Sequence, residues 1–279
     1  MNDFESLLAR LAIPDPFYEK VLGEFRNRRL TVVLRSQREG RLAGVPMAQH
    51  AAKALGIEGD WKKHNGEEVQ KGEAVARFQG LAEPIMKLEN LVIGIIAKPS
   101  GIATAAAKAV HAAGGRVRLV SGGWKKHPVL IKEMVREAVA AGGFGQRILD
   151  QPFLYLDKNY VRIFGGIGQT LRAVAADRTA KVIQVRGEFA PIAEEAREAI
   201  RNGAKVVMVD TGSWEDLDKV LQVMKAGKSS SGVQTAFAGG IRIEDIPALV
   251  RKGVDILDIG AAILDAPWLE LSYDVVKEK

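Results

Sequence analysis

A regular alternation of short apolar strands with helical segments constrains this chain more than any other feature. It begins near residue 89 and continues to the C-terminal part, with a repeat of roughly 25 residues. Short strands separated by helices are typical of parallel βα units, and the even spacing favours a closed α/β barrel, with an open doubly wound sheet as the alternative. The six expected strands are Arg116–Val120, Phe153–Leu156, Lys181–Val185, Lys205–Val209, Val233–Phe237 and Asp255–Ile259.

The first third of the chain lacks this repeat. Residues Arg29–Leu34 predict a β-branched strand, and residues 40–56 predict a turn followed by an amphipathic helix. Residues 64–80 alternate apolar and polar side chains around glycines, as hairpins do. The sequence therefore predicts a small α+β unit ahead of the repeating part, with domains at residues 1–112 and 113–279.

Composition excludes several classes of protein. The 279 residues contain no cysteine, which excludes disulfides, thiolate metal sites and iron–sulfur clusters. The first residues carry acids where a signal peptide would carry bases. The longest apolar run, Leu91–Ala97, is much shorter than the roughly 20 residues that a membrane-spanning helix requires. We expect a soluble, cytoplasmic protein without a membrane segment.

The charge balance favours an anionic partner. The 40 basic and 34 acidic residues leave a net charge of +6. The bases are interleaved with acids and aromatic residues make up 6% of the chain, so the sequence has neither a basic stripe nor a stacking platform for nucleic acid. A phosphorylated small molecule is the expected partner, and nucleic acid is disfavoured.

Two turns of small residues follow the last two expected strands, at Ala238–Ile241 and Gly260–Ile263. In both candidate architectures ligands bind at the carboxyl ends of the strands. Small residues there let main-chain N–H groups approach a phosphate closely, although tight βα turns without a ligand also favour glycine. The predicted phosphate-binding residues are Gly239, Gly240, Gly260 and Ala261.

Two carboxylates follow neighbouring strands of the predicted barrel. Asp210 comes directly after the apolar run KVVMV, and Glu188 follows KVIQVRG. Carboxylates at adjacent strand ends can hold Mg²⁺ or the hydroxyls of a ribose. The alternative is a structural role, because a carboxylate at the end of a strand also caps the next helix.

Basic residues lie near the same predicted edge of the barrel. Such side chains at strand ends can neutralise phosphate or carboxylate oxygens, although exposed lysines are more often solvated. A desolvated Lys158, enclosed by Asp157 and Asn159, would also be able to form a Schiff base. The predicted anion-binding residues are Lys125, Lys126, Arg147 and Lys158.

Three segments in the same order resemble one enzyme family. They are NGEEVQKGEAVARFQG, the run PSGIAT at Pro99–Thr104, and the closing run AGGIRIEDIPALVRKGVDILDIGAA. Together they resemble the quinolinate phosphoribosyltransferases, the decarboxylating enzymes of NAD synthesis, and their molybdenum-associated relatives. The resemblance implies an α/β protein with an N-terminal α+β sandwich domain, a C-terminal incomplete α/β (TIM-like) barrel, and assembly into a homodimer or larger oligomer.

The resemblance also implies roles for particular residues. The glycine turns at residues 239–240 and 260–261 match the family's 5′-phosphate turns, and Asp210 matches an acid at a strand end. Lys158, Glu188 and Asp210 are the expected catalytic residues, with Asp210 also as ligand to the Mg²⁺ that accompanies phosphoribosyl pyrophosphate. Arg147 matches the second half of an Asn-His-Arg motif, whereas Lys125 or Lys126 stands in for a displaced cation.

Several cations of the family pattern are replaced here, which predicts an altered acceptor site. Asn90 stands where the family has an arginine, and Gln146 stands where it has a histidine. We therefore expect a phosphoribosyltransferase whose acceptor is not quinolinate, which is a pyridine dicarboxylate. The enzyme would join a phosphoribosyl group to, or remove it from, a different aromatic nitrogen acceptor. The alternatives are a catalytically silent paralogue that binds ligand or acts as a scaffold, and a Schiff-base lyase or isomerase that uses Lys158.

Overall fold

The structure, a computed structural model, describes residues 3–226 and 232–276. The chain divides into two compact units. Unit 1 comprises Met1–Ala107, Pro128–Gly143 and Asp265–Lys279, and unit 2 comprises Lys108–His127 and Phe144–Leu264. The units differ from the predicted division at residues 112 and 113, because the chain returns to unit 1 twice.

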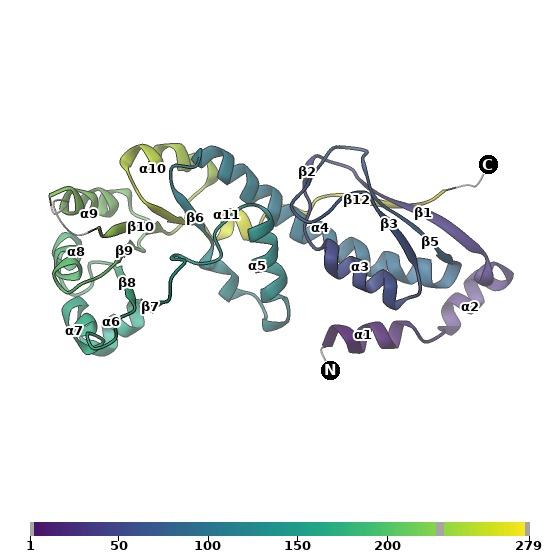
Figure 1. The fold of residues 1–279 in the computed structure, drawn as a ribbon, viewed down its shortest axis with the longest axis horizontal. Coiled ribbons are helices and arrows are strands. Elements are labelled where there is room, and N and C mark those ends of the chain that lie inside the picture. The colour runs from purple at the N-terminus through teal and green to yellow at the C-terminus, as the bar shows by residue number, and fades with distance from the viewer. Residues whose placement is uncertain (1–2, 227–231, 277–279) are drawn as a thin grey trace. The chain divides into compact units, whose positions relative to one another are not determined.

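Unit 1 contains an antiparallel sheet with the strand order β12-β1-β5-β3 (Figure 1). Alternate side chains of β1 and β5 face the same core, which is the period-2 pattern that the sequence predicted. The strand at the edge comes from the far end of the chain, and it pairs Val275 with Val32. The strands are β1 (Arg29–Ser36), β3 (Glu58–Trp61), β5 (Ala74–Leu81) and β12 (Leu271–Val275).

Two helices bury the apolar side of this sheet. The helices α3 (Val45–Ala54) and α4 (Ala82–Ala113) pack with β1 and β5 into one hydrophobic core around Phe78. The ring of Phe78 meets Trp61 edge-on at a centroid distance of 5.3 Å. The predicted strand and helix in this region are therefore confirmed.

The predicted hairpin in residues 64–80 is wrong in its pairing. The short strand β4 (Glu68–Val69) pairs with β2 (Gly40–Arg41), whereas β5 joins the main sheet. Alternation of polar and apolar residues predicts that strands exist, but the partner of each strand depends on contacts made elsewhere in the chain.

The run PSGIAT lies inside α4 and serves the fold. Ser100 Oγ accepts a hydrogen bond from Ala43 N at 3.0 Å, and Thr104 Oγ accepts one from Arg41 N at 2.8 Å. These bonds tie α4 to the segment that carries β2. The motif that points to a family therefore has a packing role in this structure.

Proline and glycine in this helix allow two close backbone approaches. Pro99 has no N–H, so it leaves the carbonyl of Ile95 without its usual helical donor, and the backbone of Gly44 approaches that oxygen. On the next turn Gly101 packs against the C-terminal segment, where a Cβ would lie 2.1 Å from the carbonyl oxygen of Pro267.

The same helix is long and apolar enough to cross a membrane by length and composition alone. However, 61% of its most apolar window is buried inside the structure. A core helix of a soluble protein passes the same test, and α4 forms the core of unit 1.

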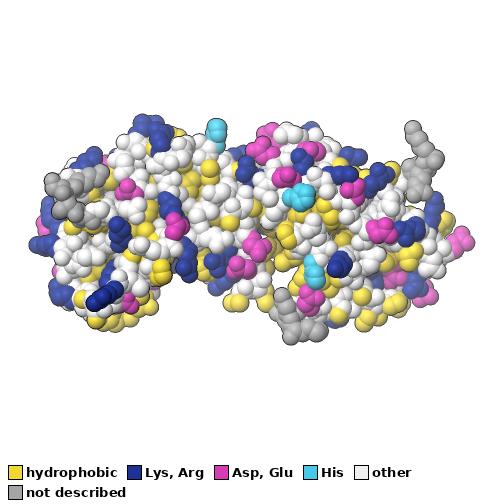
Figure 2. Space-filling view, in the orientation of Figure 1, with side chains coloured by type: hydrophobic (Ala, Val, Ile, Leu, Met, Phe, Trp, Pro, Cys, Tyr) yellow, Lys and Arg dark blue, Asp and Glu magenta, His cyan; other side chains and the backbone are white. Residues whose placement is uncertain are grey.

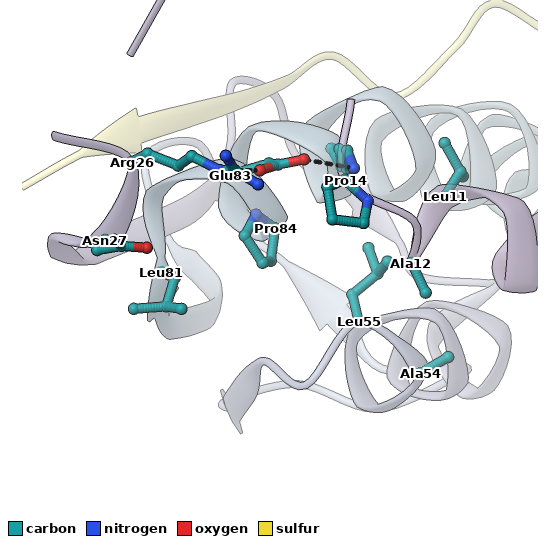
Figure 3. Close-up of a pocket in the computed structure, with 11 residues that line it drawn as sticks. Leu11, Ala12, Pro14, Arg26, Asn27, Ala54, Leu55, Leu81, Glu83 and Pro84 are labelled. Atoms are coloured by element: carbon teal, nitrogen blue, oxygen red, sulfur yellow. Dashed lines mark hydrogen bonds and ion pairs between the residues drawn. The ribbon is translucent and has the colours of Figure 1, made fainter. Parts of the chain in front are cut away.

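The N-terminal segment is held by a buried ion-pair network (Figure 3). It contains α1 (Asp3–Leu11), α2 (Pro16–Leu22) and a 3₁₀ helix at Gly23–Asn27. Glu83, which is 6% exposed, pairs with Lys87 at 2.8 Å and with Arg26 at 2.7 Å, and it also accepts a hydrogen bond from Asp15 N. Burial opposes ionisation of Glu83, but the bonds from Lys87, Asp15 and Arg26 prevail and lower its pKa to about 2.

A pocket of about 220 Å³ lies beside this network (Figure 3). Its charged lining groups, Arg26, Glu83 and Lys87, are bonded to one another. We therefore assign the pocket no ligand.

Unit 2 contains a curled parallel sheet that forms an incomplete barrel (Figure 1). Within the described residues its six strands follow the order β6-β11-β10-β9-β8-β7. Apart from β6, neighbours in the sheet are neighbours in sequence, which confirms the predicted incomplete barrel and rules out the doubly wound alternative. The strands are β6 (Arg118–Val120), β7 (Phe153–Leu156), β8 (Ala180–Val185), β9 (Val206–Val209), β10 (Gln234–Ala238) and β11 (Ile256–Asp258).

Helices connect these strands, as the sequence predicted. On α9 the side chains of Leu217, Val220, Leu221 and Met224 are buried, in agreement with their helical spacing. The helices of unit 2 are α6 (Lys158–Phe164), α7 (Ile167–Ala173), α8 (Ile192–Arg201), α9 (Trp214–Ala226), α10 (Ile246–Lys252) and α11 (Ala261–Leu264), with 3₁₀ turns at Gly122–Lys126 and Ile243–Asp245. The segment Val129–Ile131 and α5 (Lys132–Ala141) belong to unit 1.

The close approach at Gly101 predicts a local loss of stability on substitution. Gly101→Ala should lower the free energy of unfolding by about 1–3 kcal/mol, because the new methyl group clashes with the main chain at Pro267. Gly94→Ala is the matched control on the same helix: its Cβ would meet no atom within 4 Å, so it should raise stability by up to about 1 kcal/mol. Urea denaturation measures both, and equal midpoints for the two variants would contradict this packing.

The Glu83 network predicts acid sensitivity. A carboxyl whose folded-state pKa is lowered stabilises the protein above its ordinary pKa of 4.5, and that contribution is lost as the pH falls through about 2. Glu83→Gln should remove this pH dependence. It should also cost about 3–5 kcal/mol at neutral pH, because buried Lys87 loses its partner.

The control for this prediction is Glu19→Gln. Glu19 is exposed and lies 3.5 Å from Arg26, so its loss should cost at most about 1 kcal/mol. Denaturation curves recorded over acidic and neutral pH test both variants. A Glu83→Gln protein that still follows the parent's acid profile would show that the network does not control it.

Candidate active site

The carboxyl ends of the parallel strands bring charged residues together on the concave face of unit 2. Val206 and Met208 of β9 face the barrel core, so the alternation directs Asp210 to the same side at the end of that strand. The same argument directs Arg186 inward beyond β8 and Asp258 inward on β11. The site is built from these strand ends.

Arg186 bridges two of the predicted site carboxylates. Its Nη1 lies 2.9 Å from Asp210 Oδ2 and also donates to the carbonyl oxygen of Asp210. Its Nε lies 3.3 Å from Glu188 Oε1. All three side chains are partly exposed, at 30%, 28% and 30% for Arg186, Asp210 and Glu188. The structure thus brings Glu188 and Asp210 together through a guanidinium group that lies between them.

Glu188 is held by a second arginine. Arg162 on α6 donates from Nε and Nη2 to the two carboxylate oxygens of Glu188, at 2.8 and 2.7 Å. The hydrogen bond from Arg162 lowers the pKa of Glu188, burial opposes this, and the charges of Arg162 and Arg186 lower the pKa further. Glu188 is therefore ionised and fully bonded.

A buried carboxylate fixes the loop that carries Arg186. Glu195, 2% exposed on α8, accepts hydrogen bonds from the main-chain N–H groups of Arg186, Gly187 and Phe189, at 2.9, 2.8 and 3.0 Å. Because both oxygens of Glu195 are occupied by main-chain donors, its role is to position the loop.

Asp258 lies on β11 under the loop that follows β6. Its Oδ1 accepts the N–H of Gly122 at 2.7 Å. Burial raises the pKa of Asp258 and the charge of Asp210 raises it further, whereas the Gly122 bond and the charges of Lys125 and Lys126 oppose the shift. The ionised form of Asp258 is therefore disfavoured, because the Gly122 bond and the two lysines offset burial only in part.

Tyr155 on β7 contacts side chains of the neighbouring strands β8 and β9. Its hydroxyl accepts a bond from Gln184 Nε2 at 2.8 Å and lies 3.2 Å from the sulfur of Met208. Burial raises the pKa of this phenol, and so do the nearby negative charges of Asp258, Asp210 and Asp157. The concave face therefore gathers acidic side chains around one buried hydroxyl.

The glycine turns after β10 and β11 leave main-chain donors unused. Gly239 and Gly240 have φ angles of +107° and +66°, which favour glycine. The backbone of Gly239 also packs against Gly212, where a Cβ would clash, so packing is a second reason for glycine at this position. Among the described residues, the N–H groups of Gly239, Gly240 and Gly260 donate no hydrogen bond.

The other predicted site residues differ in their surroundings. Lys158 is partly buried at the start of α6, its N–H donates to Gln184 Oε1 at 3.0 Å, and it lines a water-sized pocket with Arg186 and Glu188. Lys125 and Lys126 are exposed near Asp258, and Ala261 is exposed after the β11 turn.

Arg147 is exposed ahead of β7. Its carbonyl oxygen accepts a bond from Arg118 Nε at 3.1 Å, and its own side chain makes no ion pair within the described part of the chain. The contacts in the structure do not join it to the carboxylates of the strand ends.

The donor set does not fit a protein-held magnesium ion. In residues 3–226 and 232–276 no three acidic or histidine side chains come together as metal ligands. Asp210 and Glu188 are both bonded to Arg186. Asp210 as a metal ligand therefore stays a prediction.

Sequence reasoning missed several residues of this site. Arg186, Asp258, Tyr155, Gln184 and Glu195 are not among the residues that the sequence predicted for the site. Asp258 had a signal, since it is an acid at an inward position of the apolar strand DILDI. Glu195 had none, because a helical surface glutamate and a buried loop anchor look alike in sequence.

Charge is dispersed over the visible surface (Figure 2). Lys and Arg side chains are scattered among acidic ones on that face and form no continuous stripe. The expectation that nucleic acid is not the partner stays a prediction.

Comparison with known families covers nearly the whole chain. The family model for the quinolinate phosphoribosyl transferase C-terminal domain matches residues 102–274, and the model for the N-terminal domain of that family matches residues 17–100.

Individual relatives agree with the family models. The chain is 29% identical over 243 residues to the human carboxylating nicotinate-nucleotide pyrophosphorylase, covering 84% of this chain and 78% of that protein. The solved structure of the nicotinate-nucleotide pyrophosphorylase from Francisella tularensis has the same fold, with a TM-score of 0.81 and 23% identity over 99% of this chain and 97% of that one. The corresponding structure from Pyrococcus furiosus has a TM-score of 0.79 at 20% identity, covering 98% and 76%.

The raised pKa of Asp258 predicts a stabilising substitution. The raised folded-state pKa of this carboxyl makes the folded protein less stable as the pH rises above the ordinary value of 3.8. The reason is that the unfolded chain releases its proton at a lower pH than the folded protein does. Asp258→Asn keeps an oxygen for Gly122 N–H and should be more stable than the parent at neutral pH.

The test is urea denaturation over a range of pH. The advantage of Asp258→Asn should shrink as the pH falls toward 3.8, where the parent carboxyl becomes neutral in both states. A variant that is less stable than the parent at neutral pH would refute the argument.

Proposed function

Because the chain belongs to the quinolinate phosphoribosyltransferase family, we propose that it transfers a phosphoribosyl group between pyrophosphate and the ring nitrogen of an aromatic acceptor other than quinolinate. The family membership confirms the resemblance that the sequence motifs indicated. The observation that supports the proposal best is the set of unused N–H groups at Gly239, Gly240 and Gly260, next to acidic strand ends.

These N–H groups would bind the 5′-phosphate of the ribosyl group. Main-chain donors at strand ends hold phosphate without a bulky side chain, and a Cβ at Gly240 or Gly260 would meet no atom within 4 Å. The space in front of both glycines is therefore open to a ligand.

Bond cleavage and bond formation would take place at ribose C1. The bond from C1 to the pyrophosphate oxygen breaks with both electrons going to pyrophosphate, and the lone pair of the acceptor nitrogen forms the new bond to C1. A proton on that nitrogen, where the acceptor carries one, passes to solvent. Asp210 would stabilise the positive charge that develops on the ribose ring. Lys158, Lys125 and Lys126 would neutralise the departing pyrophosphate.

The acidic surroundings support an acceptor with less negative charge than quinolinate. Asp157, Asp210 and Asp258 are near enough to raise the pKa of Tyr155. A dicarboxylate placed here would be repelled, and each charged hydrogen bond missing from the family's cationic clamp costs about 1.5–3 kcal/mol. The altered acceptor site is thus part of the proposal, as is the direction of the reaction.

The remaining parts of the proposal concern metal, assembly and location. Any Mg²⁺ would enter with phosphoribosyl pyrophosphate as part of the substrate. Assembly as a homodimer or larger oligomer is proposed from the family resemblance. A cytoplasmic location is proposed because a chain without cysteine suits a reducing compartment.

Isothermal titration with phosphoribosyl pyrophosphate tests the proposal. We expect Gly260→Asp to weaken binding at least about tenfold, because the new carboxylate repels the phosphate. Gly260→Ala is the matched control: its methyl group enters open space, and binding should stay within about twofold of the parent.

Three outcomes would contradict the proposal or part of it. A flat titration with phosphoribosyl pyrophosphate and with mononucleotides would remove the ligand class. Binding without release of pyrophosphate, across a panel of pyridine and azole acceptors, would favour the silent paralogue that acts as a ligand-binding subunit. Release of pyrophosphate with quinolinate as the best acceptor would refute the altered acceptor site.

A further inference from the structure

A cation already lies between Asp210, the expected magnesium ligand, and Glu188. We propose that Arg186 replaces a divalent metal ion in this site, so that the protein binds its diphosphate ligand without a metal ion held by its own carboxylates. The diphosphate part of this inference rests on the proposed function, whereas the exclusion of metal is a property of the free protein.

The geometry of Arg186 supplies the first argument. Its guanidinium contacts Asp210 Oδ2 at 2.9 Å through Nη1 and Glu188 Oε1 at 3.3 Å through Nε. A metal ion that used both carboxylates would have to occupy the space that this planar group fills. Because Arg186 Nη1 also donates to the carbonyl of Asp210, the guanidinium is anchored to the strand end as well as to the side chain.

Arg162 completes the replacement of charge. It binds Glu188 through two parallel hydrogen bonds of 2.7 and 2.8 Å, the arrangement in which arginine binds carboxylates best. Arg162 and Arg186 together bring two positive charges to this edge of the site, which equals the charge of one divalent ion.

Two other carboxylates of this region, Glu195 and Asp258, already have hydrogen-bond partners. Glu195 uses both oxygens for three main-chain N–H groups. Asp258 accepts the N–H of Gly122, and its raised pKa shows that its ionised form is disfavoured. A metal ion at either carboxylate would therefore compete with the hydrogen bonds that already hold it.

Arg186 keeps donor capacity for a ligand. Nε and Nη1 are used by Glu188 and Asp210, and Nη2 makes no hydrogen bond within residues 3–226 and 232–276. The side chain is 30% exposed, so Nη2 can reach an incoming phosphate oxygen. The backbone of Arg186 is held by buried Glu195, which limits the conformational entropy that the arginine loses on binding.

The first experiment measures metal binding by the free protein. Titration with Mn²⁺, followed by its electron paramagnetic resonance signal, should detect no binding to the parent chain. Arg186→Gln frees Asp210 from its charge partner and should gain Mn²⁺ binding by at least about tenfold. Arg186→Lys keeps the positive charge and should not bind Mn²⁺.

Arg162→Gln is the matched control. It removes one guanidinium from Glu188 but leaves Asp210 bonded to Arg186, so it should not gain Mn²⁺ binding. Circular dichroism and thermal melting establish that each variant is folded. Mn²⁺ binding by the parent, or a folded Arg186→Gln variant that gains none, would overturn the proposal.

The second experiment needs no variant. Phosphoribosyl pyrophosphate is titrated into the parent protein in excess EDTA and again in excess Mg²⁺, and the two affinities should agree within about threefold. Loss of binding in EDTA would overturn the proposal. If the compound binds under neither condition, the proposed function fails, and the Mn²⁺ titration still decides the role of Arg186.

Discussion

The parallel register of the sheet in unit 2 is the constraint on which the site depends. Paired strands run in the same direction, so alternate residues of β8, β9 and β11 face the same core. The last inward-facing residues of these strands therefore meet at one edge of the sheet. Arg186, Asp210 and Asp258 are brought together in this way from segments far apart in the sequence. A shift of one residue in any of these strands would turn its charged residue toward the helices.

Charge is balanced unevenly at that edge. Glu188 and Asp210 are matched by Arg162 and Arg186, whereas Asp258 has a single N–H partner and a raised pKa. The paired groups are held in position, and the poorly paired carboxyl is the one whose protonation is most open to change by a ligand. An acidic, partly uncompensated surface of this kind disfavours an acceptor with two carboxylates, which connects the electrostatics to the proposed change of substrate.

The sequence predicted the elements more accurately than their partners. All six strands of the repeating part were placed within two residues of their observed bounds, since short apolar runs between helices have few other interpretations. The pairing of β4 with β2 was missed, because residues 68–69 and 40–41 carry no mark of their partner. The return of β12 to the first sheet was missed for the same reason, since Leu271–Val275 looks like the end of the barrel until its register with β1 is known.

By itself, the sequence determined the fold class, the family and the positions of the glycine turns and of Asp210, because each depends on local pattern or on short motifs. The tertiary structure alone decided what these groups contact. It placed the guanidinium of Arg186 between Asp210, the expected metal ligand, and Glu188. It also directed the oxygens of Glu195 to a loop and bonded the partly buried Asp258 to the N–H of Gly122. Contacts between residues distant in sequence set burial and distance, and these two quantities control whether a carboxylate binds metal, positions a loop or changes its pKa.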